Sequence, residues 1–203
     1  RVLETLAREG YEGVLVSHCE KEVVMRDDLY DSQNPITWST LSRPEKAEIN
    51  SFEDIIRMAE EVRFEGTIHV AHVSTIEVVD TINNYNSFPL RMSFPLKFSC
   101  GVTPHHLFLD NSRLSSEDGA WYKCNPPLRD RITQEGLLER FLEGRIAILE
   151  SDHAPHTEED KQARVPASGI ISGPVWPYVI QKLDQLGMSA ENIFRATFDN
   201  ARQ

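Results

Sequence analysis

Four short apolar runs, each followed directly by histidine or acidic side chains, constrain the fold of this 203-residue chain most strongly. The runs span residues 13–17, 67–71, 96–102 and 146–149. Their length and their β-branched content are typical of buried strands. The side chains that follow them include His18, Glu20, His72, His105, His106 and Asp152. Because a β/α barrel gathers the carboxyl ends of its parallel strands at one face, we expect these side chains to share one edge of a sheet.

Amphipathic helical segments separate the predicted strands. The clearest begins at Pro44 and ends before Gly66, with apolar residues at helical spacing. Its charged residues, Glu48 among them, are expected to form a solvated face. Further helices are predicted at about 76–82, 131–143, 174–186 and 189–197. The alternation of strands and helices favours a parallel α/β sheet.

The number of strands sets the size of the predicted architecture. A complete β/α barrel has eight strands and about 250 residues, whereas only four strands can be assigned here. We therefore predict an α/β fold that forms the second half of a TIM-type β/α barrel, with about four parallel strands and their helices. Residues 1–203 are interpreted as a partial catalytic domain whose earlier strands lie outside this sequence.

Composition narrows the range of functions. The net charge is −11, from 32 acidic and 21 basic side chains, which argues against nucleic-acid binding and favours a small-molecule substrate. No run of 18 apolar residues occurs, so no membrane span is predicted. The three cysteines, Cys19, Cys100 and Cys124, have no CxxC spacing and are typical of a reducing cytoplasm.

The side chains at the strand ends are of the types that ligate zinc and leave a position open for water. An isolated histidine in an apolar strand is more often a hydrogen-bonded core residue. That interpretation is kept for His69, His105 and His106. Repetition at successive strand ends instead favours metal ligation by His18, His72 and Asp152. A helix cap or a hydrogen-bonded turn is the alternative for Asp152.

Six longer motifs extend the pattern. In chain order they are VSHCE (16–20), SRP (42–44), HVAHVST (69–75), VTPHHL (102–107), KCNPPLR (123–129) and SDHAPHT (151–157). Together they resemble dihydroorotase, of the amidohydrolase superfamily, over roughly residues 14–161. Dihydropyrimidinase and allantoinase share this architecture, but the NPPLR and DHAPHT motifs are closer to dihydroorotase.

The resemblance implies a β/α-barrel site with one or two zinc ions. By position, His18 and His72 would be metal ligands, and Asp152 would be both a ligand and the catalytic acid–base. Asn125 and His156 would bind the ring and the carboxylate of the substrate. The remaining ligands, a His-x-His pair and a carboxylated lysine or an aspartate, would lie outside this sequence, as would any flanking β-sandwich.

Two local departures from the family pattern concern the region over the substrate rather than the metal ligands. Gly101 stands where similar proteins often have glutamate. Residues 169–177 lack the Gly-x-x-Gly-x-Glu motif that usually follows the last strand.

The activity implied by the resemblance is reversible cyclisation of N-carbamoyl-L-aspartate to L-dihydroorotate, a step of cytoplasmic pyrimidine biosynthesis. The isolated chain is expected to be inactive, because about half of the strands and ligands are missing from it. One alternative is another cyclic amidase of the dihydropyrimidinase or allantoinase type. The other is a non-catalytic, dihydroorotase-like scaffold subunit. Expected partners are a second copy of the chain or a transcarbamoylase.

Overall fold

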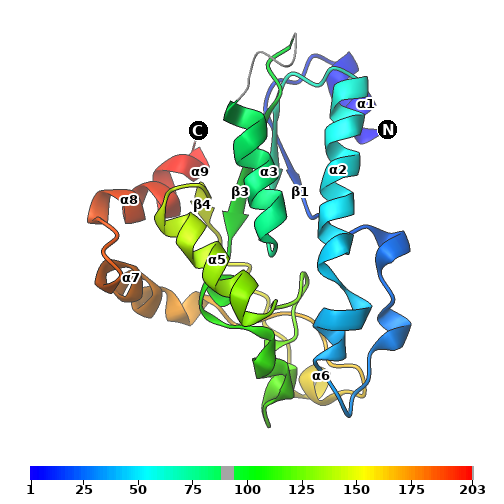
Figure 1. The fold of residues 1–203 in the computed structure, drawn as a ribbon, viewed down its shortest axis with the longest axis vertical. Helices are drawn as coiled ribbons and strands as arrows, with labels where there is room; N and C mark the ends of the chain where they lie inside the picture. Colours follow the sequence, from blue (N-terminus) through cyan, green and yellow to red (C-terminus); the bar gives the residue numbers. More distant parts are fainter. Residues whose placement is uncertain (88–93, 203) are drawn as a thin grey trace.

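A four-stranded parallel sheet organises the chain in the computed structural model, which describes residues 1–87 and 94–202 (Figure 1). The strands are β1 (Val14–Ser17), β2 (Thr67–Val70), β3 (Lys97–Val102) and β4 (Ile148–Leu149). They lie in the order β1-β2-β3-β4, and each neighbouring pair is parallel. The α/β prediction with four parallel strands is therefore confirmed.

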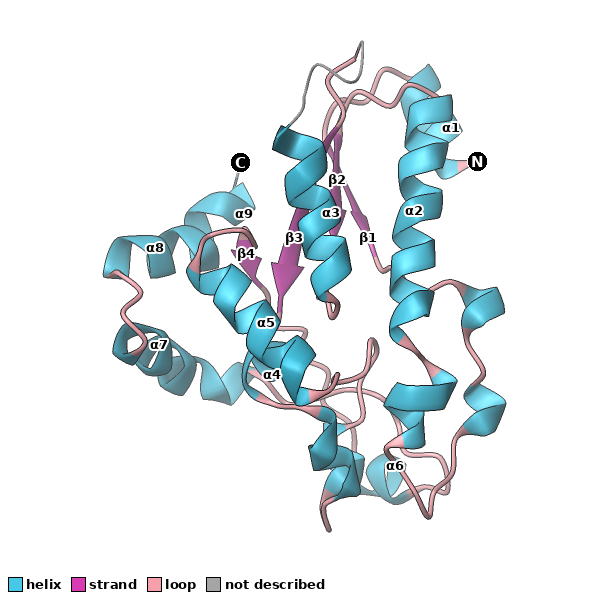
Figure 2. Ribbon diagram, in the orientation of Figure 1, coloured by secondary structure: helices cyan, strands magenta, loops and turns pink. Residues whose placement is uncertain are grey.

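Helices alternate with the strands along the chain, and several of them cover one face of the sheet (Figure 2). In chain order they are α1 (Val2–Arg8), α2 (Glu45–Glu61), α3 (Ile76–Ser87), α4 (Pro104–Phe108), α5 (Arg131–Leu142), α6 (Glu158–Gln162), α7 (Trp176–Gln185), α8 (Ala190–Phe194) and α9 (Asn200–Arg202). Figure 2 shows α2, α3 and α5 lying over the strands. Within the described part of the chain, no helix is long and apolar enough to cross a membrane.

The two faces of the sheet differ in burial because successive strand side chains point to opposite sides. Ile68, Phe98 and Val102 face the helices and are buried in the hydrophobic core. The other face borders a cavity of about 1020 Å³, whose lining includes Val16 and His69. On that face Val16 is 62% exposed.

Helix α3 extends five residues beyond its predicted end at residue 82, because two asparagines bind backbone groups there. Asn83 Nδ2 donates to the carbonyls of Val79 and Arg145. The Asn86 side chain donates to the carbonyl of Phe98 and accepts from its amide, which anchors the helix to β3. Of the segment between α3 and β3, residues 88–93 lie outside the described residues.

The prediction that Glu48 belongs to a solvated helix face is wrong. Glu48 is 1% exposed, and its carboxylate accepts hydrogen bonds from the amides and hydroxyls of Ser74 and Thr75. The guanidinium Nε of Arg129 donates to the Ser74 hydroxyl at 3.0 Å. Glu48 thus fixes the turn that follows β2, because a buried carboxylate is stable only when hydrogen-bonded.

Candidate metal centre

The predicted metal ligands emerge from the same edge of the sheet. His18 directly follows β1, His72 follows β2 and Asp152 follows β4. The register aligns these exits, since Ser17 pairs with Val70 and Val102 with Leu149. The geometry therefore collects side chains that lie more than 130 positions apart in the sequence.

The imidazoles of His18 and His72 face one another in a geometry that fits a shared metal ion. Nδ1 of His18 lies 3.2 Å from Nε2 of His72, and the rings meet edge to face at 73°. Two nitrogens bound to one tetrahedral zinc at ~2.0–2.1 Å lie ~3.3 Å apart. The observed separation is thus the one that two zinc ligands require.

Glu20 orients His18 from the opposite side of its ring. Oε2 of Glu20 lies 2.9 Å from Nε2 of His18 and 2.7 Å from a guanidinium nitrogen of Arg43. Because a carboxylate only accepts, Nε2 of His18 carries the hydrogen and Nδ1 presents its lone pair toward His72. Burial by itself would raise the pKa of Glu20, but the His18 hydrogen bond and the Arg43 charge outweigh burial and lower it. A carboxylate that holds a ligating histidine in this way is a recurrent feature of metal sites.

Glu20 and Arg43 were not assigned a role from the sequence. Both belong to motifs that were recognised there, and the position of Glu20 two residues after His18 was the available signal. Nothing in the sequence, however, shows that the loop containing Arg43 folds back onto the end of β1.

Two of the predicted ligands occupy strained backbone conformations. His72 and Asp152 both have φ of +40°. Non-glycine residues in the left-handed region cost about 1–3 kcal/mol and concentrate at functional sites. Burial raises the pKa of the Asp152 carboxyl, and the nearby imidazoles of His72 and His18 partly offset this effect.

Several buried polar atoms near these ligands have no hydrogen-bond partner within residues 1–87 and 94–202. They include Nδ1 of His72, Oε1 of Glu20, both ring nitrogens of His105 and Oδ1 of Asn125. Nε2 of His105 lies 4.0 Å from Oδ2 of Asp152. Buried polar groups are normally satisfied, so such a cluster indicates a place where water, a metal or a substrate binds.

A second group of potential metal-binding atoms lies in His105, His106 and Cys124, and the last two fit a structural role better. For His105 the prediction of a hydrogen-bonded core residue is wrong, because neither of its ring nitrogens has a partner among the described residues. Both ring nitrogens of His106 are engaged, by Thr103 Oγ1 at 2.8 Å and by the Pro126 carbonyl at 3.1 Å. Burial raises the pKa of the Cys124 thiol to about 12, which disfavours the thiolate that a metal needs. His106 is therefore the packed, hydrogen-bonded residue predicted from the sequence. His69 is too, since it bonds Ser99 and Glu150.

Asn125 and His156, the predicted substrate-binding residues, lie on two loops that are fastened together. His156 Nε2 lies 2.9 Å from the Ser168 carbonyl. Lys161 is 2% exposed. Its ammonium lies within hydrogen-bond distance of four carbonyls, those of Ala120, Lys123, Ala167 and Gly169. Lys161 thereby joins the stretch just before Asn125 to the stretch that binds His156. Among the described residues, no hydrogen bond links Asn125 or His156 to the three predicted ligands.

His153 anchors a neighbouring loop rather than the site. Its Nδ1 accepts from the amides of Ser172 at 3.1 Å and Gly173 at 2.9 Å. Its ring is exposed. The imidazole therefore fixes the turn that leads into α7.

Sequence comparison relates the chain to curated enzymes. It is 38% identical over 128 residues to a dihydroorotase of Halobacterium salinarum, covering 63% of this chain and 27% of that protein. It is 32% identical over 160 residues to a dihydroorotase of Geobacillus sp., covering 77% of this chain and 35% of that protein. The resemblance to dihydroorotase is confirmed. The chain spans about a third of the length of these relatives, and no family model matches it.

Solved structures share the fold at lower sequence identity. A dihydropyrimidinase of Brevibacillus agri superposes with a TM-score of 0.79 at 22% identity, over 97% of this chain and 44% of that one. A dihydroorotase of Saccharomyces cerevisiae, in complex with 5-fluoroorotic acid, gives 0.73 at 18% identity, over 98% and 51%. These enzymes are β/α barrels of the amidohydrolase type, so the four-stranded sheet corresponds to part of such a barrel.

Proposed function

We propose that these residues belong to a zinc-dependent cyclic amidohydrolase that interconverts L-dihydroorotate and N-carbamoyl-L-aspartate. The 3.2 Å approach of His18 Nδ1 to His72 Nε2, with Glu20 behind His18, is the observation that carries the metal assignment. The choice of substrate is supported by similarity to dihydroorotases at 32–38% identity.

His18, His72 and Asp152 would hold zinc, with one or two ions completed by ligands that these residues do not supply. Bound zinc lowers the pKa of water and polarises a carbonyl, which is the chemistry that opening a cyclic amide needs. Asp152 would accept a proton from the attacking water and return it to the departing amide nitrogen.

Asn125 and His156 would recognise the ring and the carboxylate of the substrate. The buried Oδ1 of Asn125 has no partner among the described residues and can accept a hydrogen bond from a ring N–H. The imidazole of His156 is held by the Ser168 carbonyl on the loop that Lys161 fastens. Because dihydroorotate carries a carboxylate that dihydrouracil lacks, His156 would favour dihydroorotate with a hydrogen on both ring nitrogens: Nε2–H is given to Ser168, and Nδ1–H would donate to the carboxylate.

Two other functions compete with this proposal. The similarity in fold to a dihydropyrimidinase supports a cyclic amidase for uncharged rings. A catalytically silent scaffold subunit, paired with a transcarbamoylase, would be favoured by the loss of metal ligands. The facing imidazoles of His18 and His72 argue against that loss. A cytoplasmic location and a place in pyrimidine biosynthesis belong to the same proposal.

A chimeric enzyme tests substrate choice. These residues would replace the matching segment of the Geobacillus dihydroorotase, and the zinc-loaded product would be offered dihydroorotate and dihydrouracil. We expect turnover of dihydroorotate and at most trace turnover of dihydrouracil. The opposite preference would support the dihydropyrimidinase alternative. A folded, zinc-bound chimera that acts on neither substrate would support the scaffold. The isolated 203-residue chain is expected to show no turnover.

A further inference from the structure

Gly101 and Glu150 occupy one space on adjacent strands. Gly101 lies in β3 and pairs with Ile148 of β4, two residues before Glu150. A Cβ placed on Gly101 would overlap the Glu150 carboxyl group, with Cδ and Oε1 as its nearest neighbours. The carboxylate therefore fills the volume that a side chain at position 101 would need.

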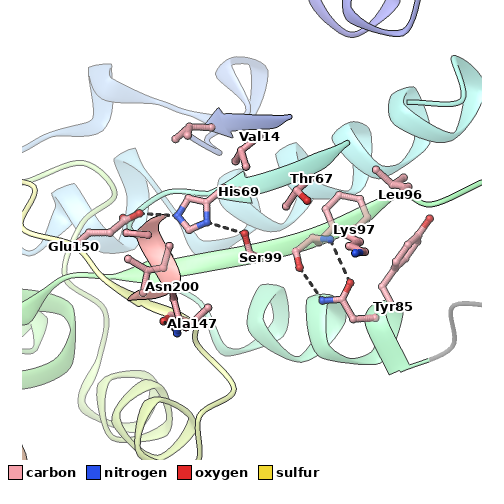
Figure 3. A pocket seen from close by; sticks show the side chains of 15 residues that line it. Val14, Thr67, His69, Tyr85, Leu96, Lys97, Ser99, Ala147, Glu150 and Asn200 are labelled. Atoms are coloured by element: carbon pink, nitrogen blue, oxygen red, sulfur yellow. Dashed lines mark hydrogen bonds and ion pairs between the residues drawn. The ribbon is translucent and has the colours of Figure 1, made fainter. Parts of the chain in front are cut away.

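The Glu150 carboxylate connects His69 of β2 to His72, which lies two residues beyond the end of the strand. Oε1 lies 2.6 Å from Nε2 of His69, and Oε2 accepts a hydrogen bond of 2.6 Å from the backbone amide of His72. His69 is held on its other side by Ser99 at 2.8 Å. Figure 3 shows Glu150 and His69 pointing toward one another at the end of the cavity, with Ser99 beyond.

The bond to the His72 amide acts where the backbone is strained. His72 has φ of +40°, and its Nε2 faces the Nδ1 of His18. A short hydrogen bond to a carboxylate is stronger than one between neutral groups. Fixing this amide fixes the direction in which the His72 side chain leaves the sheet.

We propose that Glu150 is a positioning residue that holds His72 for metal binding, and that its carboxylate does so from the space that a side chain at position 101 of β3 would occupy. This inference rests on the proposed metal site, but not on the identity of the substrate. Among the described residues, Glu150 has no hydrogen bond to the imidazole of His72, so its effect is transmitted through the backbone amide.

A swap of the two positions tests the proposal in the 203-residue chain. Glu150→Ala removes the carboxylate, and the Gly101→Glu/Glu150→Ala pair returns one from the neighbouring strand. Zinc affinity is measured by chelator competition, and the His72 amide proton shift is measured by NMR without zinc. We expect Glu150→Ala to weaken zinc binding about 10- to 100-fold and to move the His72 amide upfield. The swap should recover most of both losses.

Two further variants separate positioning from packing. Gly101→Glu with Glu150 retained crowds two carboxyl groups, so it should lower the melting temperature below that of the swap. His69→Leu removes the other partner of the carboxylate and should leave the His72 amide shift nearly unchanged. Unaltered zinc affinity in folded Glu150→Ala, or a swap as weak as the single variant, would overturn the proposal.

Misfolding and failure of the metal site have their own readouts. If Glu150→Ala does not fold, the isosteric Glu150→Gln decides through the His72 amide shift, and an unchanged shift contradicts the proposal. If the wild-type segment binds no zinc within the chimera, which supplies the remaining ligands, the proposed metal centre fails. In that case the positioning of His72 by Glu150 is judged on the amide shift alone.

Discussion

Two polar clusters lie next to one another at the end of β2, and they differ in how completely they are satisfied. Glu48 is 1% exposed and receives hydrogen bonds from the amides and hydroxyls of Ser74 and Thr75. His72, two residues before Ser74, has a strained φ of +40° and a buried Nδ1 without a partner in the described part of the chain. The Glu48 carboxylate is satisfied by neighbouring residues of the chain, whereas the buried Nδ1 of His72 is left for something that binds. Burial of polar groups alone would not distinguish them.

The largest predicted effect comes from replacing Asp152, the proposed acid–base of the region around His72. In a catalytically competent form of the enzyme, Asp152→Asn should lower kcat about 100- to 10,000-fold, because an amide cannot accept the proton and ligates zinc poorly. Steady-state kinetics and zinc content would be measured together. Glu159→Gln, an exposed acid on the same segment, serves as the control. Activity within a few-fold of wild type would reduce Asp152 to a turn residue.

Removing the Glu48 carboxylate should instead cost stability. Glu48→Ala leaves two amides and two hydroxyls without their acceptor. The loss of a buried, hydrogen-bonded charge typically costs about 3–5 kcal/mol of unfolding free energy. Urea denaturation would measure it, with the exposed Glu53→Ala on the same helix as the control. A loss below about 1 kcal/mol would show that the cluster is not the structural anchor described here.

His156 probes the substrate side of the region around His72. A hydrogen bond to a charged group is worth about 1.5–3 kcal/mol. His156→Ala should therefore lower kcat/KM for dihydroorotate about 10- to 100-fold, with zinc content unchanged, since His156 is not proposed as a ligand. An unchanged kcat/KM would limit the imidazole to fastening the loop through Ser168. Loss of zinc from the variant would contradict substrate binding in a different way, by placing His156 in the metal site.

The sequence was sufficient where local pattern and topology coincide. The apolar runs before His18, His72 and Asp152 identify strands, and parallel strands necessarily bring their carboxyl ends to one edge. Convergence of these residues could therefore be predicted. The helix predicted at about 189–197 likewise begins for a local reason, because the Ser189 side chain accepts from the Asn192 amide.

The sequence was insufficient where a charge finds a partner far along the chain. Glu48 binds Ser74, Arg43 binds Glu20, and Glu150 binds the His72 amide. Periodicity places Glu48 on a polar helix face, but it does not show which turn packs against that face. The absence of a glutamate at position 101 was visible in the sequence. That Glu150 fills the space beside Gly101 required the structure, because the register of β3 and β4 decides which side chains meet.

Lys123 gives the smallest predicted effect, and nothing in the sequence indicates its burial. The residue is 4% exposed, its ammonium donates to Ser168 Oγ at 2.7 Å, and it lies 3.5 Å from the Trp38 ring centre. Burial, followed by the charges of Arg43 and Lys161, lowers the pKa of Lys123 to about 8. Its pKa in the unfolded chain is about 10.4.

Between these two values the unfolded chain binds more protons than the folded one, so the contribution of Lys123 to stability rises with pH. Near neutral pH the buried charge is a cost, which is relieved as the amine deprotonates. We expect the rise to be about 1–2 kcal/mol between about pH 7.5 and 9.5, and Lys123→Met should abolish it. Urea unfolding across this range would measure the slope, with the exposed Lys46→Met as the control. Equal slopes in wild type and Lys123→Met would mean that the ammonium stays fully charged in the fold, held by Ser168 and the Trp38 ring.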